Sequence, residues 1–303
     1  MVAPVKKMKW VILGGESQLG RAMAAELARA DTEYVSLNHA QLDITNQRDI
    51  SNWFTKEKPN VVLNTAAWTN VDSAEAHENL ALRINAFGPK LLATASAEID
   101  ASYIHISTDY VFSGNSRSPI EEEAELSPVS AYGRTKAQGE RYVLDIYPKG
   151  TFLVRTAWLY SPWGKNFVKT MLRIALEESR EVEVVKDQIG SPTSATDLAA
   201  QLHKMILNKI APGIYHGTNS GRASWFEFAQ EIFKLAEQDS NRIVPVSSTN
   251  FPRPAPRPAF SVLGSDHWLN EGMNPLQNWK EGLKDAFPAI VLALQQGELS
   301  DGN

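Results

Sequence analysis

The sequence predicts an α/β protein built on a doubly wound parallel sheet, with a smaller and partly discontinuous C-terminal lobe. Short apolar runs alternate with longer helical patterns through the first half of the chain. The runs are apolar on both faces, which is typical of parallel strands covered by helices on both sides. A glycine-containing turn joins the first run to the first helix, at the edge where ligands bind in such folds.

Five apolar runs predict the strands of the sheet, at residues 10–13, 34–37, 61–64, 102–107 and 152–155. Helical patterns separate them, at residues 19–29, 49–56, 75–85 and 89–98 and in the segment that carries Tyr132 and Lys136. A crossover helix is what joins two parallel strands, because a short turn cannot do so. We therefore expect the carboxyl ends of these strands to share one edge and to hold the ligand.

The pattern loosens beyond about residue 160. Further helices are expected at residues 166–178, 196–207 and 225–237, and further strands at 181–185 and 213–216. The proline-rich residues 251–258 must be extended, because proline excludes a helix there. We expect a sheet domain over 8–158 and a lobe formed mainly by 159–295, although 196–220 should return to the sheet domain. A frayed tail is expected over 296–303.

Composition excludes several classes of function. The net charge of −5 provides no basic surface for a nucleic acid. The chain has no cysteine, which rules out disulfides and thiolate metal sites and fits the reducing cytoplasm. No apolar run is long enough to span a membrane, and the run after the basic residues 1–9 is too short for a signal peptide. No metal site is predicted, because the six histidines are scattered.

The turn at residues 14–20 is the first candidate site. It lies between a strand and a helix, where its glycines allow a pyrophosphate to approach the backbone and the helix N-terminus directs free amides at that charge. The alternative is an ordinary glycine-rich turn without a ligand. The residues expected to contact a dinucleotide here are Gly14, Ser17, Gln18, Leu19 and Gly20.

The second and third strands end in further candidates. Asn38 follows the second strand where an acid would hold the adenosine ribose of NAD, so its identity favours NADPH or the use of both cofactors, with Arg21 available for the extra phosphate. Asp43 and Ile44 could cover the adenine edge, although Asp43 could instead cap the next helix. Small residues after the third strand, including Ala66 and Ala67, leave room for a ligand or for close helix packing.

Tyr132 and Lys136 lie one helical turn apart. A phenol titrates near ~10, and an ammonium beside it would lower that pKa toward neutrality. The pair alone is a weak signal, because such pairs often decorate an exposed helix face. Ser107 and Thr108 end the fourth strand, where the Thr108 hydroxyl and the phenol can converge on one carbonyl oxygen.

These residues together resemble the extended short-chain dehydrogenases/reductases, whose dinucleotide-binding domain has the Rossmann fold. The shared positions are Gly14, Ser17, Gly20, Ala66, Ala67, Asn85, Ser107, Thr108, Asp109, Tyr132 and Lys136. From Trp10 to about Phe287 the chain is more narrowly similar to the dTDP-4-dehydrorhamnose reductases. That similarity rests on residues 65–72, 107–112, 155–158, 166–167, 187–193 and 257–258.

The resemblance implies NADPH- or NADH-dependent reduction of the 4-keto group of dTDP-4-dehydro-6-deoxy-L-mannose to dTDP-L-rhamnose. Tyr132 would give the proton, Thr108 would hydrogen-bond the carbonyl oxygen, and Lys136 would also bond the nicotinamide ribose. Asn85 would hold the catalytic helix or a water relay, unless it is simply a helix-terminal amide. The implied cofactor contacts are Gly14, Ser17, Gln18, Leu19, Gly20, Asn38, Asp43, Ile44, Ala66, Ala67, Thr69, Asn85, Ser107, Tyr132 and Lys136.

The implied substrate contacts are Val71, Asp72, Thr108, Asp109, Trp158, Asn166, Gln188, Thr193 and Arg257. Arg257 is the candidate for the diphosphate, because a planar guanidinium binds phosphate bidentately. Trp158 would offer a flat face to the hexose, or else belong to the core. Members of the family sometimes carry a divalent ion such as Mg²⁺ at a dimer contact, so a homodimer is also expected, although the sequence does not map that site.

Two departures from the family keep an alternative open. Ser17 replaces the usual glycine, and Glu16 adds a negative charge near the pyrophosphate. Both favour a non-catalytic nucleotide-binding subunit, such as the regulatory β subunit of methionine adenosyltransferase, but the intact Thr108, Tyr132 and Lys136 argue against it. A sugar-nucleotide epimerase is a further alternative. A dehydratase would need a carboxylate pair after Thr108, and the chain has only Asp109 there.

Overall fold

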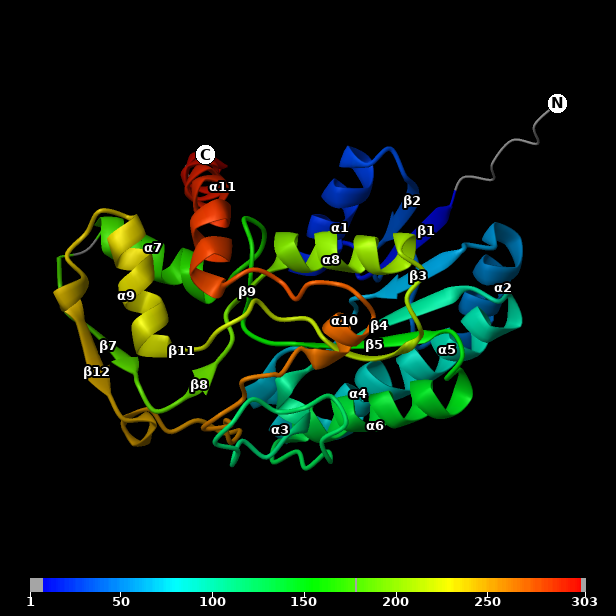
Figure 1. The fold of residues 1–303 in the computed structure, drawn as a ribbon, viewed down its shortest axis with the longest axis horizontal. Coiled ribbons are helices and arrows are strands. Elements are labelled where there is room, and N and C mark those ends of the chain that lie inside the picture. The colour runs from blue at the N-terminus through cyan, green and yellow to red at the C-terminus, as the bar shows by residue number, and fades with distance from the viewer. Residues whose placement is uncertain (1–7, 178, 301–303) are drawn as a thin grey trace.

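The computed structural model describes residues 8–177 and 179–300, apart from the side chains of 298–300, so most of the basic N-terminal segment lies outside it. Its centre is a six-stranded, wholly parallel sheet in the order β10-β5-β4-β3-β1-β2 (Figure 1). The strands are β1 (Lys9–Leu13), β2 (Glu33–Leu37), β3 (Val61–Asn64), β4 (Ser102–Thr108), β5 (Thr151–Thr156) and β10 (Gly213–His216). The predicted fold class is confirmed.

Helices cover both faces of the sheet. On one face Trp10 and Ile12 of β1 pack in one core cluster with residues of α1 (Gln18–Arg29) and α8 (Ala195–Leu207). On the other face Val11 and Leu13 pack in a second cluster with residues of α2 (Gln47–Glu57), α5 (Gly88–Glu98) and α6 (Ala131–Ile146). This alternation buries every residue after Lys9 in β1, which explains why the strand is continuously apolar in sequence.

The strand order places the ligand crevice. β1 pairs with β2 on one side and with β3 on the other, so the direction of winding reverses between β1 and β3. Ligands of doubly wound sheets bind outside the carboxyl ends of the strands at such a switch point. In this chain the turn after Leu13 and the loop after Asn64 meet there.

The second half of the chain forms the lobe at the left of Figure 1 and also completes the sheet. α7 (Phe167–Glu177), α9 (Trp225–Leu235) and α11 (Trp279–Ser300) enclose a third core cluster together with the strand pair β7 (Val182–Val185) and β12 (Ile243–Val246). α8 and β10 return to the sheet, where β10 pairs with β5. The division into 8–158 and 159–295 stays a prediction.

Short elements connect the two parts. β6 (Leu159–Tyr160) pairs with β9 (Thr193–Ser194), and β8 (Ile189–Gly190) pairs with β11 (Ala223–Ser224). The helix α10 (Asp266–Asn270) packs Trp268 into the sheet cluster, where its indole N–H donates to the His216 carbonyl at 2.8 Å. The segment 251–258 contains neither helix nor strand, as its prolines require.

The helix predicted over 75–85 is broken in the structure. It consists of α3 (Val71–Ala76), α4 (Glu78–Leu82) and a π-helical turn, η1 (Arg83–Phe87), which runs into α5. Pro89 explains the π turn, because it has no N–H to donate to the carbonyl of Asn85. A Cβ atom at Gly139 of α6 would lie 2.2 Å from that carbonyl oxygen, so glycine permits the close approach of the two helices.

α11 extends to Ser300 and so includes the first residues of the tail predicted over 296–303, which otherwise stays a prediction. The sequence reading missed this helix altogether, although its apolar residues recur at helical spacing. Leu283, Phe287, Ile290 and Leu294 all lie buried in the lobe cluster, and their burial stabilises the helix. Residues 301–303 lie outside the described part of the chain.

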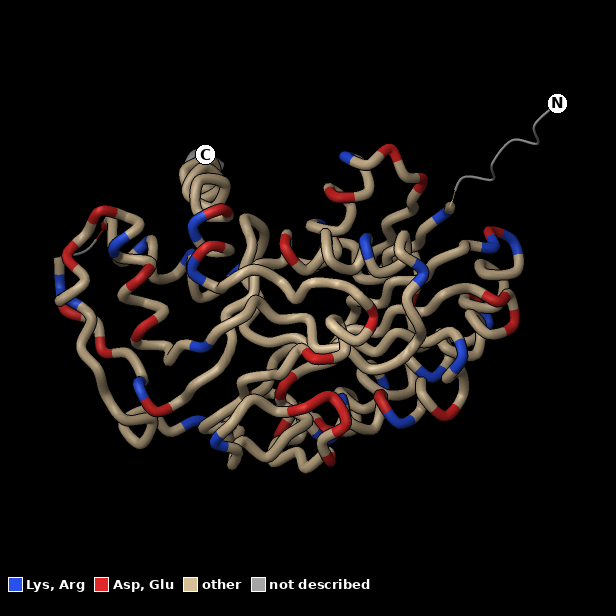
Figure 2. The backbone as a smooth tube through the Cα atoms, in the orientation of Figure 1, with Lys and Arg blue, Asp and Glu red and all other residues tan. Residues whose placement is uncertain are grey.

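Charge is distributed evenly over the molecule. Figure 2 shows acidic and basic residues interspersed along both lobes, with an acidic run at residues 121–125. In the part of the chain that the structure describes, no helix is both long and apolar enough to cross a membrane.

His216, at the end of β10, gives the fold a specific sensitivity to acid. Its Nδ1 lies 3.1 Å from the Gly264 carbonyl oxygen and its Nε2 lies 3.2 Å from Arg155 Nη1. The ring must therefore donate from Nδ1 and accept at Nε2, which only the neutral form can do. Burial, with the Arg155 charge beside the ring, lowers the pKa of His216 from 6.5 to about 3.

We expect the His216→Gln variant to lose less stability in acid than the parent chain. Between pH 6.5 and pH 3 the unfolded histidine binds a proton that the folded one does not, so stability falls as the pH falls through this window. The contribution is at most about 1.4 kcal/mol per pH unit. Urea unfolding at several pH values measures it, with the exposed His39→Gln as control. Parallel pH profiles for the parent and His216→Gln would contradict this assignment.

Candidate active site

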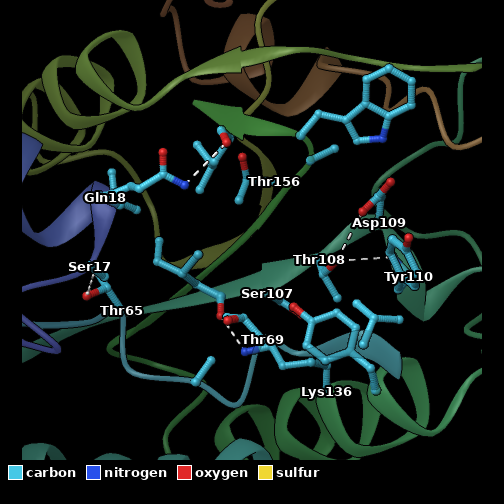
Figure 3. A pocket seen from close by; sticks show the side chains of 18 of the residues that line it. Ser17, Gln18, Thr65, Thr69, Ser107, Thr108, Asp109, Tyr110, Lys136 and Thr156 are labelled. Atoms are coloured by element: carbon cyan, nitrogen blue, oxygen red, sulfur yellow. Dashed lines mark hydrogen bonds between the residues drawn. The ribbon is translucent and has the colours of Figure 1, made fainter. Parts of the chain in front are cut away.

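A crevice opens at the carboxyl ends of β1, β3, β4 and β5 (Figure 3). Its central cavity, of about 490 Å³, is bordered by the start of α1 on one side and by Thr108, Tyr132 and Lys136 on the other. A second cavity of about 390 Å³ continues past the end of β2. The two share Glu16, Ser17, Thr65, Ala67 and Thr69, so they form one elongated site of the kind that a dinucleotide requires.

Most of the predicted residues border these two cavities. The central cavity is lined by Ser17, Gln18, Leu19, Ala67, Thr69, Val71, Ser107, Thr108, Asp109, Tyr132, Lys136 and Trp158. The second cavity adds Gly14, Asn38, Asp43, Ile44 and Ala66.

The glycine turn fits the phosphates of a dinucleotide. Gly14 has a φ of +76°, and a Cβ atom there would lie 2.7 Å from the backbone nitrogen of Ala66. A Cβ atom at Gly20 would lie 2.5 Å from the Gly14 carbonyl oxygen, so Gly20 shapes the turn from behind the cavity. The Ser17 hydroxyl accepts from Gly20 N at 2.9 Å and lies 2.8 Å from Thr65 Oγ1. Ser17 therefore caps α1 with its hydroxyl and still borders both cavities.

Asp43 holds the loop at the far end of the second cavity. Its Oδ1 accepts from Thr45 N at 2.8 Å and from Thr45 Oγ1 at 2.9 Å. Burial alone raises the pKa of Asp43, but the Thr45 hydrogen bonds and the nearby cations outweigh it and lower the pKa below its usual value. The N-cap of α2 is Asn46, so the alternative role of Asp43 as that cap is wrong.

Tyr132 lies at the start of α6 and is 9% exposed. Its ring meets the ring of Tyr110 edge-on, with the centroids 5.6 Å apart. Burial raises the pKa of Tyr132 to about 12, while a hydrogen bond with Thr108 acts in the opposite direction. Thr108 and Tyr132 thus lie side by side at the wall of the central cavity. At neutral pH the phenol is protonated, which is the state that a proton donor needs.

The sequence predicts that Lys136 lowers the pKa of the Tyr132 phenol, and the structure contradicts this. Burial, Thr108 and Asp109 shift that pKa, and Lys136 does not contribute. Its Nζ donates to the Ile106 carbonyl oxygen at 2.6 Å and lies 3.5 Å from His105 Nε2. Burial lowers the pKa of Lys136 to about 8, against the opposing charge of Glu140. The desolvated ammonium is anchored to the backbone of β4 and still borders the central cavity.

Thr108 is oriented by its neighbours. Its hydroxyl donates to Asp109 Oδ1 at 3.0 Å and accepts from Tyr110 N at 3.2 Å (Figure 3). Burial raises the pKa of Asp109 to about 6, although hydrogen bonds from Ser261 and Thr108 oppose the shift.

A buried ion pair fixes the catalytic helix to the sheet. Arg155 on β5 makes a bidentate contact with Glu140 on α6, with Nη2 to Oε2 at 2.8 Å and Nε to Oε1 at 3.0 Å. Both side chains are almost fully buried. The Ser107 hydroxyl also donates to Glu140, so it supports this helix from beneath the cavity.

Asn85 is committed to the protein. Its Oδ1 accepts from Trp68 N at 2.8 Å, and its Nδ2 donates to Trp68 O at 3.2 Å and to Thr135 Oγ1 at 3.1 Å. It is fully buried and borders neither cavity. Of the roles expected for Asn85, holding the catalytic helix fits this geometry and direct contact with a cofactor does not.

A third cavity, of about 480 Å³, lies on the lobe side and shares Tyr110 with the central cavity. Asp72, Gln188 and Arg257 of the predicted substrate set border it. Arg257 Nη2 donates to Asp72 Oδ2 at 2.9 Å, and this contact lowers the pKa of Asp72. Arg257 Nη1 also donates to Asp72 Oδ1 and to the Ala255 carbonyl oxygen, so the guanidinium that borders this cavity is already paired.

Trp158 marks the junction between the central cavity and the lobe. Its ring stacks on Trp225 with the centroids 3.5 Å apart. Its backbone has a φ of +48°, an unfavourable conformation for a side chain of this size. The stacking partner and the strained backbone together hold the indole at the cavity wall.

Two predicted substrate residues border none of these three cavities. Asn166 Nδ2 donates to Gln18 Oε1 at 3.0 Å and to Ser161 O at 2.9 Å. Thr193 is buried and its hydroxyl donates to Ser191 O at 3.0 Å. Both side chains bond other parts of the protein, so this geometry gives no support to direct substrate contact by either.

The structure adds two residues that the sequence did not assign to the site: Tyr110 borders the central and lobe-side cavities, and Trp225 supports Trp158. Glu16, expected only to add negative charge near the pyrophosphate, borders both cofactor-side cavities. Tyr110 could have been found from its place beside Thr108 in the sequence. Trp225 starts a helix far along the chain, and no local pattern links it to Trp158.

The parallel sheet, the glycine turn over the switch point and the Thr108, Tyr132 and Lys136 set define an oxidoreductase of the extended short-chain dehydrogenase/reductase class. Residues 8–291 match the family model described as the RmlD substrate binding domain. The chain therefore belongs to this family, and the resemblance to dTDP-4-dehydrorhamnose reductases is confirmed.

Three relatives show how close the similarity is. A probable dTDP-4,6-dihydroxy-2-methyloxan-3-one 4-ketoreductase of Streptomyces antibioticus is 42% identical over 94% of this chain and 97% of its own length. The crystal structure of a dTDP-4-dehydrorhamnose reductase of Clostridium acetobutylicum is 43% identical, with a TM-score of 0.89, over 94% of this chain and 100% of that one. The dTDP-4-dehydrorhamnose reductase of Bacillus anthracis, solved in complex with NADP, is 38% identical, with a TM-score of 0.89, over 93% of this chain and 99% of that one.

Proposed function

We propose that this chain reduces the 4-keto group of dTDP-4-dehydro-6-deoxy-L-mannose with NADPH or NADH and releases dTDP-L-rhamnose. The observation that carries the proposal is the convergence of Thr108 and Tyr132 on the cavity that begins at the glycine turn. The names of the relatives supply the substrate, and the NADP complex of the Bacillus anthracis enzyme supports NADPH as a cofactor.

Each residue has a defined task in this reaction. The bound nicotinamide supplies the hydride that adds to carbon 4. Tyr132 donates its proton to the oxygen on that carbon, which becomes the product hydroxyl, and a phenol is a sufficient acid because an alkoxide is a much stronger base than a phenolate. Thr108 turns its hydroxyl proton from Asp109 Oδ1 to the same oxygen and so stabilises the negative charge that grows there. The Lys136 ammonium, anchored to the Ile106 carbonyl oxygen at the border of the central cavity, holds the cofactor ribose.

The lobe-side cavity accommodates the dTDP group. Arg257 binds the diphosphate with the donors that Asp72 and the Ala255 carbonyl leave free, and Gln188 borders the same cavity. Trp158 presents its indole to the hexose in the central cavity. Tyr110 belongs to both cavities, so it marks the position where the sugar joins the diphosphate.

Further expectations belong to the same proposal. The enzyme acts in the cytoplasm on a small dTDP-sugar, binds no nucleic acid and forms a homodimer. The family resemblance supports the dimer, and the absence of cysteine is compatible with a reducing compartment. Magnesium has no such support, since no group of three or more His, Asp or Glu residues in the described chain is arranged to hold a metal ion.

The purified chain is expected to oxidise NADPH or NADH when dTDP-4-dehydro-6-deoxy-L-mannose is added. The loss of nicotinamide absorbance measures the reaction, and dTDP-D-glucose, which has no ketone, is the control substrate. Binding of the cofactor without oxidation at saturating keto sugar would contradict the proposed function and favour a non-catalytic subunit.

A further inference from the structure

Glu16 stands where three cavities meet. It borders the central cavity, the second cavity and an outer cavity of about 370 Å³ beyond the end of β2. The outer cavity is also bordered by Arg21, Ser36, Asn38 and Gln41. It adjoins the second cavity through Asn38, on the side of the crevice that lacks Tyr132 and Lys136.

The carboxylate of Glu16 is held at the end of β2. Its Oε1 accepts a hydrogen bond from Asn38 Nδ2 at 3.0 Å. The amide of Asn38 cannot be reversed without losing contacts, because its Oδ1 accepts from Gln41 N at 3.1 Å. The Asn38 backbone in turn donates to Gln41 Oε1 at 2.9 Å. These bonds fix a donor that faces Glu16.

The glycine turn packs directly on β2, which brings Glu16 to this position. A Cβ atom at Gly15 would lie 2.0 Å from Ser36 Oγ, so the turn crosses the strand in close contact. Gly14 N and Gly15 N both donate to the Leu37 carbonyl oxygen at 3.0 Å. The residue after Gly15 must therefore lie over the end of β2.

In doubly wound folds an acid at the end of the second strand hydrogen-bonds the adenosine ribose and excludes a 2′-phosphate. This chain has Asn38 at that point, yet the structure delivers a carboxylate there from the glycine turn. We propose that Glu16 determines cofactor specificity, with its carboxylate accepting from the ribose hydroxyls of NADH and repelling the 2′-phosphate of NADPH. The inference rests on the proposed function in requiring a nicotinamide cofactor.

Arg21 opposes Glu16 in the same cavity. Its Nε donates to the Glu16 carbonyl oxygen at 3.3 Å, and its side chain borders the outer cavity. A cation there attracts a 2′-phosphate, so Arg21 strengthens NADPH binding and Glu16 weakens it. NADH has no 2′-phosphate, so its affinity should depend little on Arg21. A variant that lacks one of the two charges should show the effect of the other charge on the affinity for NADPH.

Direct titration of each variant with NADH and with NADPH, by calorimetry, separates these effects without any sugar substrate. Glu16→Gln preserves the size of the side chain and can still accept from Asn38, so only the charge is lost. We expect it to bind NADPH about tenfold more tightly than the parent chain and NADH no more tightly. Arg21→Gln should weaken NADPH binding about tenfold, and raised salt should reduce both changes.

Glu33→Gln is the matched control, since it removes the same charge from an exposed position at the opposite end of β2 and should leave the NADPH to NADH affinity ratio unchanged. An unchanged ratio in Glu16→Gln, with both cofactors bound by the parent chain, would overturn the role of Glu16 and leave the proposed function intact. If the parent chain bound neither cofactor, the proposed function would fail together with the inference.

Discussion

Replacing Tyr132 with phenylalanine is expected to lower kcat about 10³-fold while leaving the dissociation constants of the cofactors within about threefold of the parent values. Phenylalanine keeps the ring that packs edge-on against Tyr110, so the start of α6 keeps its shape. The variant loses only the proton that the substrate oxygen must receive. Single-turnover absorbance measures the chemical step, and cofactor titration measures binding.

Tyr142→Phe is the matched control for this variant. It removes the same hydroxyl from the same helix at a position that borders none of the cavities of the site. Its kcat should equal that of the parent chain. A Tyr132→Phe variant that kept more than a tenth of the parent kcat would show that another group donates the proton.

The second large effect is expected from Arg155→Met, which should destabilise the fold by about 3–5 kcal/mol. The change leaves the Glu140 carboxylate buried without the guanidinium that neutralises it. Replacing both members together, as Arg155→Met with Glu140→Leu, should recover most of the loss, because the carboxylate that loses its guanidinium partner is then also removed. Urea unfolding gives the free energies of unfolding for the three chains.

An exposed ion pair supplies the comparison for Arg155. Arg134 contacts Glu78 at 2.7 Å, but both side chains are largely open to solvent. Arg134→Met should therefore cost at most about 1 kcal/mol. A loss of that small size in Arg155→Met would contradict the view that the buried pair anchors the catalytic helix.

The sheet could be predicted from sequence because its signals are local. Each strand is a short apolar run, and burial on both faces makes the run continuous, as Trp10 to Leu13 show. The catalytic set was also accessible, because Thr108 ends a strand and Tyr132 and Lys136 share one helix face. The parallel-sheet rule alone places these elements at one edge.

Other features depend on contacts that no local pattern encodes. Asp72 pairs with Arg257 across most of the chain, which ties the sheet domain to the proline-rich segment. The pKa of Tyr132 depends on its burial, and the ammonium of Lys136 is directed to Ile106 by the depth of the helix against β4. Glu16 was expected to disturb the pyrophosphate, but the packing of the turn on β2 carries it toward Asn38.

Asn166 and Thr193 show the limit of transferring roles by sequence motif. Both lie in segments that resemble the reductase family, and both face other parts of the protein. A motif records that a residue type is needed at a position. It does not distinguish a residue that contacts a ligand from one that holds the contacting loop.

The most direct test of ketone reduction by this chain is the fate of deuterium from NADPH that carries two deuterium atoms at carbon 4 of the nicotinamide. After incubation with dTDP-4-dehydro-6-deoxy-L-mannose, proton NMR and mass spectrometry of the sugar product locate the label. We expect one deuterium at carbon 4 of the hexose and a hydroxyl proton that is drawn from Tyr132 and hence from solvent. Product that lacks deuterium at carbon 4, or that carries it at a neighbouring carbon, would contradict direct reduction of the ketone.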